Sequence, residues 1–155
     1  MKKILRTLAK KKRSEIILDV DSKINLLKQI KYCLDNIFFH NHNIKTASLY
    51  YPISNEIEPF QFVKYFEDKN IIMGMPVVDI IKKSMIFRKW SPKDELRVGP
   101  LGNLEPTCDK DIILPQIMIV PMLMFDRELS RLGYGGGYYD KSIFNLKKYF
   151  QKEKK

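Results

Sequence analysis

The sequence predicts an α/β fold in which helices flank a central, largely parallel sheet within a single domain, residues 1–155. Segments with strand-like composition alternate with segments of helical periodicity, which is typical of a parallel sheet. A glycine-rich loop follows one predicted strand and precedes a helix, as ligand-binding loops do in such sheets. A chain of 155 residues, 45% of them hydrophobic, is long and apolar enough to bury one core.

The first part of the chain is predicted to be largely helical. Lys2 to Arg13 is basic and is expected to start a first helix. In residues 14–38, apolar side chains recur with helical spacing between lysines and aspartates, which predicts an amphipathic helix. The polar residues 40–45 then lead into a predicted strand from Thr46 to Tyr51, which is rich in β-branched and aromatic residues and ends at Pro52.

The rest of the chain continues this alternation. Residues 91–111 contain several prolines and glycines and are predicted to form a long irregular segment, a kind of loop that is often functional. The other predicted segments are, in order, a helix from Glu56 to Asp68, a buried strand from Asn70 to Val78, a second strand from Ser84 to Trp90 paired with it or close by, a buried strand from Ile112 to Phe125 with a turn at Pro115, and a helix from about Tyr139 to Phe150.

The formal net charge of +10 raises the question of an anionic partner. Lysine outnumbers arginine 22 to 6, whereas proteins that read bases rely on arginine, and no base-reading motif accompanies the charge. We therefore expect no nucleic-acid partner, and a basic surface that attracts small anionic molecules. A basic RNA-associated protein is the alternative that the charge alone supports.

Three features of the sequence predict where the protein is found in the cell. The longest apolar stretch, Ile112 to Phe125, is interrupted by Pro115 and Pro121 and is too short to span a bilayer, so no membrane association is expected. The basic N-terminus is not followed by an apolar segment of the signal-peptide type. Cys33 and Cys108 form no Cys-x-x-Cys pair and are expected to be reduced thiols, which predicts a cytoplasmic protein.

The loop from Arg131 to Asp140 carries the strongest chemical signal, because it holds four of the seven glycines. Backbone N–H groups without a neighbouring side chain can approach phosphate oxygens closely. Arg131 supplies a cation for phosphate, and Asp140 a carboxylate for a metal ion. The alternatives are a tight structural turn, a surface ion pair of Arg131, a helix-dipole role for Asp140 and packing roles for the tyrosines. Their clustering in one loop favours a nucleotide-using enzyme.

Residues outside the loop add further candidates. Lys2, Lys3 and Arg6 are spaced to share one helical face or nearby faces, which suits either a phosphate clamp or a solvated basic terminus. Glu56 follows a predicted strand, where an acid can hold a polar ligand or complement a helix N-terminus. Glu105, fixed by the proline that follows it, is a similar candidate.

With these residues, the chain resembles the 5-formyltetrahydrofolate cyclo-ligases, also called 5,10-methenyltetrahydrofolate synthetases. The most specific match is Val120-Pro121, then Phe125-Asp126, then the whole run from Arg131 to Asp140. The resemblance extends in the family's order from the first residues to about Phe150. Supporting matches are Lys2 with Arg6, Tyr51-Pro52 with Glu56, Met85 to Trp90, and Gly102 with Glu105-Pro106.

The resemblance implies an α/β enzyme that uses ATP and Mg²⁺ to cyclise 5-formyltetrahydrofolate to 5,10-methenyltetrahydrofolate, with release of ADP and phosphate. Its expected partners are ATP and the small folate substrate, and it is expected to be a monomer. The resemblance implies that Arg131 and Tyr138 are catalytic, that Asp140 binds the metal and that Glu56 binds the folate. The implied nucleotide-binding residues are Lys2, Lys3, Arg6, Arg131, Leu132, Gly133, Tyr134, Gly135, Gly136, Gly137, Tyr138 and Tyr139, and Tyr134, Gly135, Gly136, Gly137 and Tyr138 are also expected to contact the folate.

Some features depart from the family pattern. Family members usually continue for some tens of residues past the last helix, with more sheet and a second magnesium-ligand aspartate, so this chain is expected to be shortened at its C-terminus. Leu129 stands where the family commonly has glycine. These departures motivate an alternative hypothesis, a catalytically weak or inactive folate- or nucleotide-binding remnant.

Overall fold

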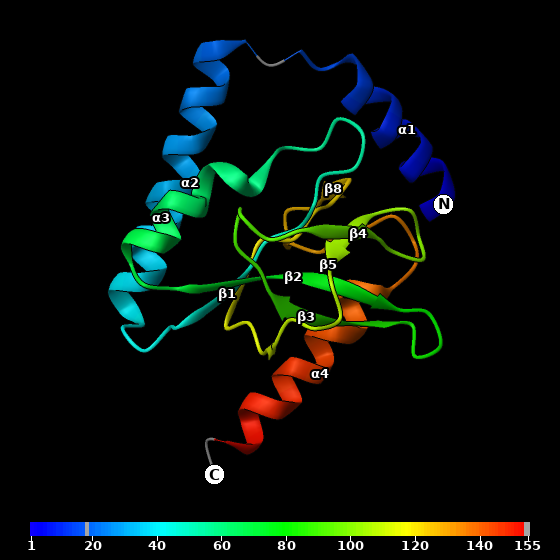
Figure 1. Ribbon diagram of the computed structural model, residues 1–155. Helices are drawn as coiled ribbons and strands as arrows, with labels where there is room; N and C mark the ends of the chain where they lie inside the picture. Colours follow the sequence, from blue (N-terminus) through cyan, green and yellow to red (C-terminus); the bar gives the residue numbers. More distant parts are fainter. Residues whose placement is uncertain (18, 154–155) are drawn as a thin grey trace.

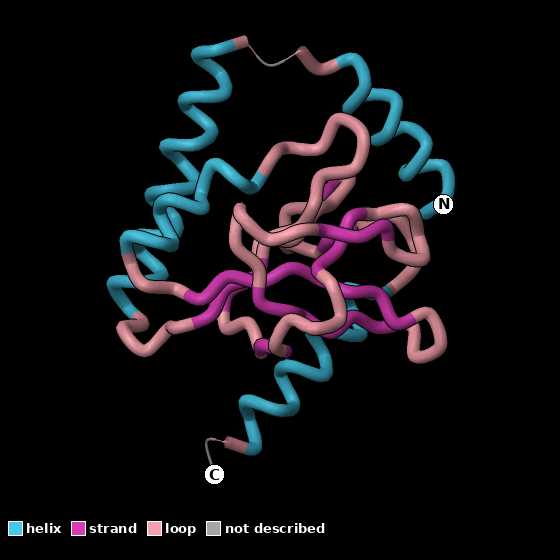
Figure 2. The backbone as a smooth tube through the Cα atoms, in the orientation of Figure 1, coloured by secondary structure: helices cyan, strands magenta, loops and turns pink. Residues whose placement is uncertain are grey.

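The computed structural model describes residues 1–17 and 19–153, and within them five strands form a central sheet in the order β6-β3-β2-β1-β7 (Figures 1 and 2). β1 pairs in parallel with β2 and β7, and β3 pairs antiparallel with β2 and β6, so four of the five strands run in one direction. The strands are β1 (Thr46–Ser48), β2 (Ile72–Asp79), β3 (Ser84–Lys89), β6 (Ile112–Ile113) and β7 (Ile117–Met118). The predicted α/β fold is confirmed.

Helices lie on both sides of this sheet. α2 (Val20–His40) and α3 (Val63–Asp68), which the short 3₁₀-helix η1 (Pro59–Phe62) precedes, pack together on one side (Figure 1). The core between them and the sheet is apolar, with Phe66 and Leu49 fully buried. α4 (Tyr138–Lys152) packs against β3 on the other side, whereas α1 (Lys2–Glu15) lies apart, beside the end of the sheet where the glycine loop is found.

Ser142 joins α4 to the sheet. It is 2% exposed, and its Oγ accepts a hydrogen bond of 2.8 Å from the backbone N–H of Met85 in β3. The same hydroxyl donates to the carbonyl of Tyr138, one turn earlier in the helix, at 2.8 Å. This pairing fixes the first turn of α4, and therefore the loop that precedes it, relative to β3.

Ser142→Ala is expected to lower the free energy of unfolding by about 1–2 kcal/mol, because a buried N–H of Met85 loses its acceptor. Urea unfolding would measure the change. Ser14→Ala, at an exposed position of α1, is the matched control, and its effect should stay below about 0.5 kcal/mol. Equal effects of the two substitutions would contradict the anchoring role of Ser142.

Two of the predicted helices differ from the observed ones. The prediction of one helix over residues 14–38 is wrong at its start, because α1 ends at Glu15 and α2 begins at Val20. Asp19 caps α2 by accepting a hydrogen bond of 2.7 Å from the N–H of Ser22. Leu18, inside the predicted helix, lies outside the described residues. The helix predicted from Glu56 becomes helical only at Pro59, the first residue of η1.

The strand predictions need similar corrections. Residues 91–111 are not irregular throughout, because β4 (Leu96–Val98) and β5 (Leu104–Pro106) form an antiparallel hairpin. The buried strand predicted from Ile112 to Phe125 is divided into β6, β7 and β8 (Met124–Phe125), and its two ends are exposed, Ile112 at 58% and Phe125 at 68%. β8 leaves the central sheet and pairs with β9 (Arg131–Leu132), which leads into the glycine loop. Along the described part of the chain, the helices are either too short or too polar for a bilayer crossing.

Candidate functional site

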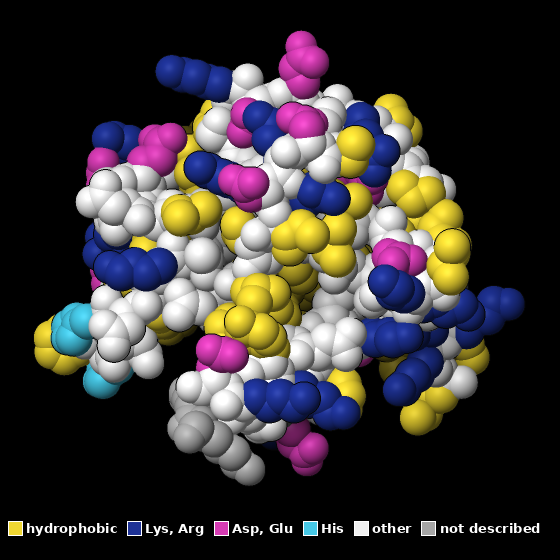
Figure 3. All heavy atoms as spheres, turned by 60° about the horizontal axis from the view of Figure 1, so that its bottom comes forward, with side chains coloured by type: hydrophobic (Ala, Val, Ile, Leu, Met, Phe, Trp, Pro, Cys, Tyr) yellow, Lys and Arg dark blue, Asp and Glu magenta, His cyan; other side chains and the backbone are white. Residues whose placement is uncertain are grey.

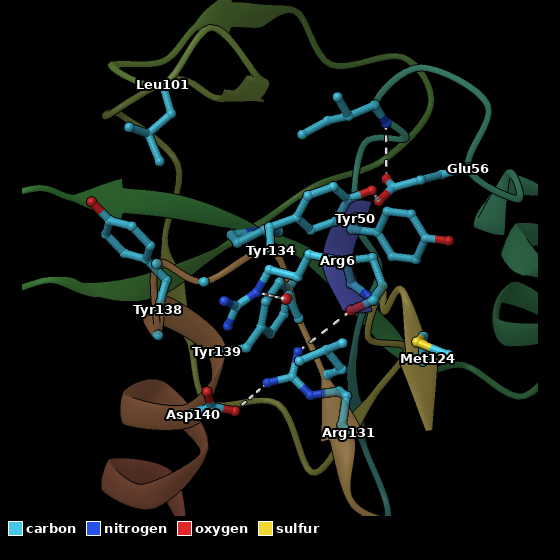
Figure 4. A pocket seen from close by; sticks show the side chains of 18 of the residues that line it. Arg6, Tyr50, Glu56, Leu101, Met124, Arg131, Tyr134, Tyr138, Tyr139 and Asp140 are labelled. Atoms are coloured by element: carbon cyan, nitrogen blue, oxygen red, sulfur yellow. Dashed lines mark hydrogen bonds and ion pairs between the residues drawn. The ribbon is translucent and has the colours of Figure 1, made fainter. Parts of the chain in front are cut away.

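A cavity of about 570 Å³ lies at the carboxyl ends of the parallel strands. Tyr50 and Tyr51 after β1, Pro121 after β7 and the end of β2 form one wall. The remaining walls come from the start of α1, the tip of the β4–β5 hairpin, and the glycine loop with the first turn of α4 (Figure 4). Segments from both ends of the sequence therefore meet in one site.

The glycine loop, residues 133–137, presents its backbone to this cavity. Gly137 is the N-cap of α4 and has a left-handed φ of 70°, and Gly135 has a φ of 111°, conformations that glycine adopts without strain. No side chain caps α4 among the described residues, so the N–H groups of its first turn are open to a ligand. Such a helix start is favourable for phosphate oxygens.

Arg131 and Asp140 form an ion pair at the edge of the loop, and Figure 4 shows their side chains pointing toward each other. The Arg131 side chain is only 16% exposed, whereas that of Asp140 is 74% exposed. The guanidinium lies over the Tyr139 ring at 5.6 Å, and Nη1 donates to the carbonyl of Pro121 at 3.4 Å. Arg131 is thus held by its surroundings, while Asp140 remains accessible to solvent and to a ligand.

Arg6 reaches the glycine loop from α1. Its Nε donates to the carbonyl of Gly133 at 2.9 Å, and a Cβ atom at Gly135 would lie 3.2 Å from its Cζ. Lys2 also lines the cavity. The predicted grouping of the N-terminal cations with the loop is therefore observed for these two residues. Lys3 is exposed and is not part of the cavity wall, so its predicted role has no geometric support.

Glu56 lies at the opposite wall with its side chain 4% exposed. One carboxylate oxygen accepts from the Tyr134 hydroxyl, and the other accepts from the backbone N–H of Ile53 at 2.9 Å. Burial, together with the nearby charge of Glu56, raises the pKa of Tyr50 to about 12, and the same two causes raise the pKa of Tyr139. The tyrosines around Glu56 are therefore neutral hydrogen-bonding groups at neutral pH.

Tyr50 gives this site an expected alkaline signature. Its folded-state pKa of about 12 exceeds the unfolded value of 10.0, so the folded state keeps a proton that the unfolded state has lost between these values. The contribution of Tyr50 to the free energy of unfolding is therefore fully present below about pH 10. It decreases as the pH rises toward about 12. Tyr50→Phe should make this decrease smaller in urea unfolding experiments, and the raised pKa values of Tyr65 and Tyr139 account for the decrease that remains. An unchanged decrease in the variant would contradict the shifted pKa of Tyr50.

The acids of the site form no all-protein metal cage within the described residues. No cluster of three or more His, Cys, Asp or Glu side chains with metal-binding geometry occurs in the described part of the chain. Asp126 also lines the cavity, but its Oδ1 accepts from the N–H groups of Glu128 and Ser130 in its own turn. Asp140 is the accessible carboxylate, and Mg²⁺ in such sites is held by one or two carboxylates plus substrate phosphates.

Some members of the site were not predicted from the sequence, and one predicted residue lies elsewhere. Tyr50, Leu101 and Asn103 line the cavity, and no local pattern marks them. Glu105, interpreted as a possible ligand-binding acid, is fully buried, with hydrogen bonds from the backbone of Val78 at 3.1 Å and from Arg97 at 2.9 Å. This carboxylate stabilises the β4–β5 hairpin instead of facing the cavity.

Leu129 and the surface charge complete the description. Leu129 has a left-handed φ of 61° in the β8–β9 turn, a conformation that favours glycine, the residue that the resemblance gives for this position. On the face shown in Figure 3, basic side chains occur at several places with acidic ones among them.

Comparisons with known proteins identify the family of this chain. The model of the 5-formyltetrahydrofolate cyclo-ligase family matches residues 2–155. The 5-formyltetrahydrofolate cyclo-ligase of Haemophilus influenzae is 28% identical over 108 residues, which cover 65% of this chain and 57% of that protein. The enzyme of the same name from Escherichia coli K12 is 34% identical over 70 residues, which cover 43% of this chain and 38% of that protein. The chain thus spans about half the length of these relatives or less.

Two solved structures have a fold similar to that of this chain. A 5,10-methenyltetrahydrofolate synthetase from Mycoplasma pneumoniae aligns with a TM-score of 0.66 at 24% identity, over 92% of this chain and 77% of that one. The synthetase of the same name from Aquifex aeolicus aligns with a TM-score of 0.62 at 26% identity, over 90% and 70% of the two chains. With the family model matching almost every residue, this chain belongs to the 5-formyltetrahydrofolate cyclo-ligase family.

Proposed function

We propose that this chain catalyses the ATP-dependent cyclisation of 5-formyltetrahydrofolate to 5,10-methenyltetrahydrofolate, with release of ADP and phosphate. The observation that carries the proposal is one cavity whose two sides differ in chemistry. A glycine loop with Arg131, Arg6 and Lys2 lies on one side, and the buried carboxylate of Glu56 lies among tyrosines on the other. The first side suits a triphosphate and the second a polar heterocycle.

On the nucleotide side, the loop amides and the cations would neutralise and orient the phosphates. Phosphoryl transfer depends mainly on such positioning and charge stabilisation. In the proposed reaction the formyl oxygen attacks the γ-phosphate, N10 captures the resulting iminium phosphate, and phosphate leaves. Arg131 would stabilise charge on the transferred group. Tyr138, which lines the cavity at the start of α4, is proposed to assist from the rim.

On the folate side, Glu56 would accept hydrogen bonds from N–H groups of the reduced pterin. Its carboxylate is buried, so an N–H donor from the substrate meets a charge that water screens little. The backbone of Gly135, Gly136 and Gly137 and the rings of Tyr134 and Tyr138 would contact the folate where the loop faces Glu56. The aromatic rings can pack on the flat pterin.

Asp140 is proposed to hold Mg²⁺ together with the ATP phosphates. When bound, the ion neutralises phosphate charge and fixes the geometry of the triphosphate. Release of Asp140 from its pair with Arg131 would leave the guanidinium free to contact the phosphates. A cytoplasmic location is also proposed, because Cys33 and Cys108 are both free thiols in the described structure.

The proposal is tested by incubating the protein with MgATP and 5-formyltetrahydrofolate and recording the near-ultraviolet absorbance of the methenyl product. Absorbance is expected to rise only when ATP, Mg²⁺ and the folate are all present. Binding of ATP and folate in calorimetry without any rise at high enzyme concentration would instead support the catalytically inactive remnant. Absence of binding and of turnover would overturn the proposal.

A further inference from the structure

Arg13, in the last turn of α1, connects two loops that are far apart in the sequence. Its Nε donates to Oδ1 of Asn55 at 2.8 Å, and Nδ2 of Asn55 donates back to the Arg13 carbonyl at 2.8 Å. Its Nη1 donates to the Tyr134 hydroxyl at 2.5 Å and lies 3.6 Å from Oε1 of Glu56. One guanidinium thus contacts the loop after β1 and the glycine loop at the same time.

The donor chemistry of Arg13 fixes the direction of this network. A guanidinium has only donors, so the Tyr134 hydroxyl must accept from Arg13 and donate its own proton to Glu56. The second oxygen of Glu56 is held by the N–H of Ile53. Without Arg13, the Tyr134 hydroxyl keeps its hydrogen bond to Glu56 but loses the donor that fixes it from the other side, and a carboxylate that is 4% exposed loses its nearby positive charge.

Arg13 and Arg6 contact different sides of the site. They are seven residues apart, two helical turns, and so lie on the same face of α1. Within α1, all of which is described, Ala9 alone is buried, so the helix is attached to the site largely through polar contacts. Arg6 contacts the carbonyl of Gly133 on the nucleotide side, whereas Arg13 contacts Tyr134 and Glu56 on the other side.

We propose that Arg13 is a positioning residue that holds Tyr134 and Glu56 in the geometry required by the folate, an inference that rests on the proposed function. Arg13 does not line the cavity itself, so its action passes through these two side chains. Its side chain is 21% exposed, which leaves it accessible enough to be substituted without opening the core.

Arg13→Gln is expected to raise KM for 5-formyltetrahydrofolate about 10-fold, because the charge-assisted hydrogen bonds that hold Tyr134 beside Glu56 are lost. KM for ATP should change less than about twofold, because Arg6 and Arg131 keep their contacts. Arg13→Lys preserves the charge near Glu56 but not the fork of donors, so it should recover part of the folate affinity. Lys12→Gln, which removes the neighbouring exposed charge of α1, is the matched control and should behave as wild type.

The split between the two KM values separates positioning from a general loss of structure. If Arg13 merely kept α1 in place, its loss would displace Lys2 and Arg6 as well, and both KM values would rise together. A joint rise, or an unchanged KM for the folate, would therefore overturn the role of Arg13.

Equilibrium binding keeps this inference distinct from the proposed function. Calorimetry with each ligand should show the same split in dissociation constants, with weaker binding of the folate alone in Arg13→Gln. If wild type binds both ligands and Arg13→Gln binds them equally well, only the role of Arg13 is overturned. A wild-type protein that binds neither ligand would overturn the proposed function, and this inference with it.

Discussion

Arg131→Ala is expected to lower kcat/KM for ATP by about 10²–10³-fold, with much of the loss in kcat. The guanidinium lies beside the glycine loop, where a Cβ atom at Gly133 would be 3.2 Å from its Nη1. Its contacts with the Pro121 carbonyl and the Tyr139 ring keep it at 16% exposure and would hold it beside the loop after its pair with Asp140 separates. A fixed cation of this kind stabilises charge that develops on the transferred phosphoryl group.

Arg127→Ala provides the matched control for this experiment. Arg127 lies in the exposed β8–β9 turn and is not part of the cavity wall, so its loss removes the same formal charge from the same region. Its kinetic constants are expected to stay within about twofold of wild type. Circular dichroism and urea unfolding of both variants establish that they are folded. An Arg131→Ala enzyme with wild-type turnover would show that Arg131 has no catalytic role.

Gly135→Ala is expected to lower kcat/KM for ATP by about 10²-fold, because the loop backbone cannot be kept with a side chain at this position. The φ of 111° is unfavourable for any residue with a Cβ atom. The added atom would also press on the Arg6 guanidinium, whose Nε binds the carbonyl of Gly133. The loop amides and Arg6 would therefore both move from the positions proposed for phosphate binding.

Gly102→Ala is the control for Gly135→Ala, because it introduces backbone strain without disturbing the loop amides or Arg6. Gly102 has a left-handed φ of 79° at the tip of the β4–β5 hairpin, and a Cβ atom there would have no neighbour within 4 Å in the described chain. Its substitution should cost about 1–2 kcal/mol of stability. Although its neighbours Leu101 and Asn103 line the cavity, Gly102 itself does not, so KM for ATP should change less than about twofold. Wild-type ATP kinetics in Gly135→Ala would contradict the need for bare backbone in the glycine loop.

The glycine loop could be predicted from sequence because its determinants are local. Arg131, Asp140 and the intervening glycines occupy ten consecutive residues, and the helix that follows them is predicted by its composition. The short strand β9, directly before the glycines, lies inside the segment interpreted as loop and was not predicted. The opposite wall depends on contacts between distant segments, such as the hydrogen bond between Tyr134 and Glu56 across 78 positions. Glu56 and Glu105 illustrate the limit, since both are acids close to a proline, and only packing shows that one faces the cavity and the other supports a hairpin.

Arg13 has a weak signal in the sequence. The chain is rich in lysine, and two of its six arginines lie seven residues apart in the first helix, a spacing that places them on one face. The helix break at Asp19 has a signal as well, because an acid three residues before Ser22 is a favourable N-cap. The apolar periodicity on both sides of Asp19 favours one long helix. The structure instead places α1 beside the cavity, so the chain has to break between the two helices.

The strand errors have a different physical cause. Prolines and glycines in residues 91–111 indicate an irregular segment, yet the paired carboxylate and guanidinium of Glu105 and Arg97 stabilise a hairpin there. In the stretch from Ile112 to Phe125, hydrophobicity predicts a buried strand, yet most of these side chains are exposed or half-buried, and changes of direction distribute the stretch between two sheets.

A crystal structure with a non-hydrolysable ATP analogue, Mg²⁺ and 5-formyltetrahydrofolate tests the central claim most directly. We expect the triphosphate to lie on the backbone amides of residues 133–137, in contact with Arg131, and the pterin to lie against Glu56. A triphosphate bound away from the glycine loop, or a folate bound outside the cavity, would contradict the assignment of both sides of the site.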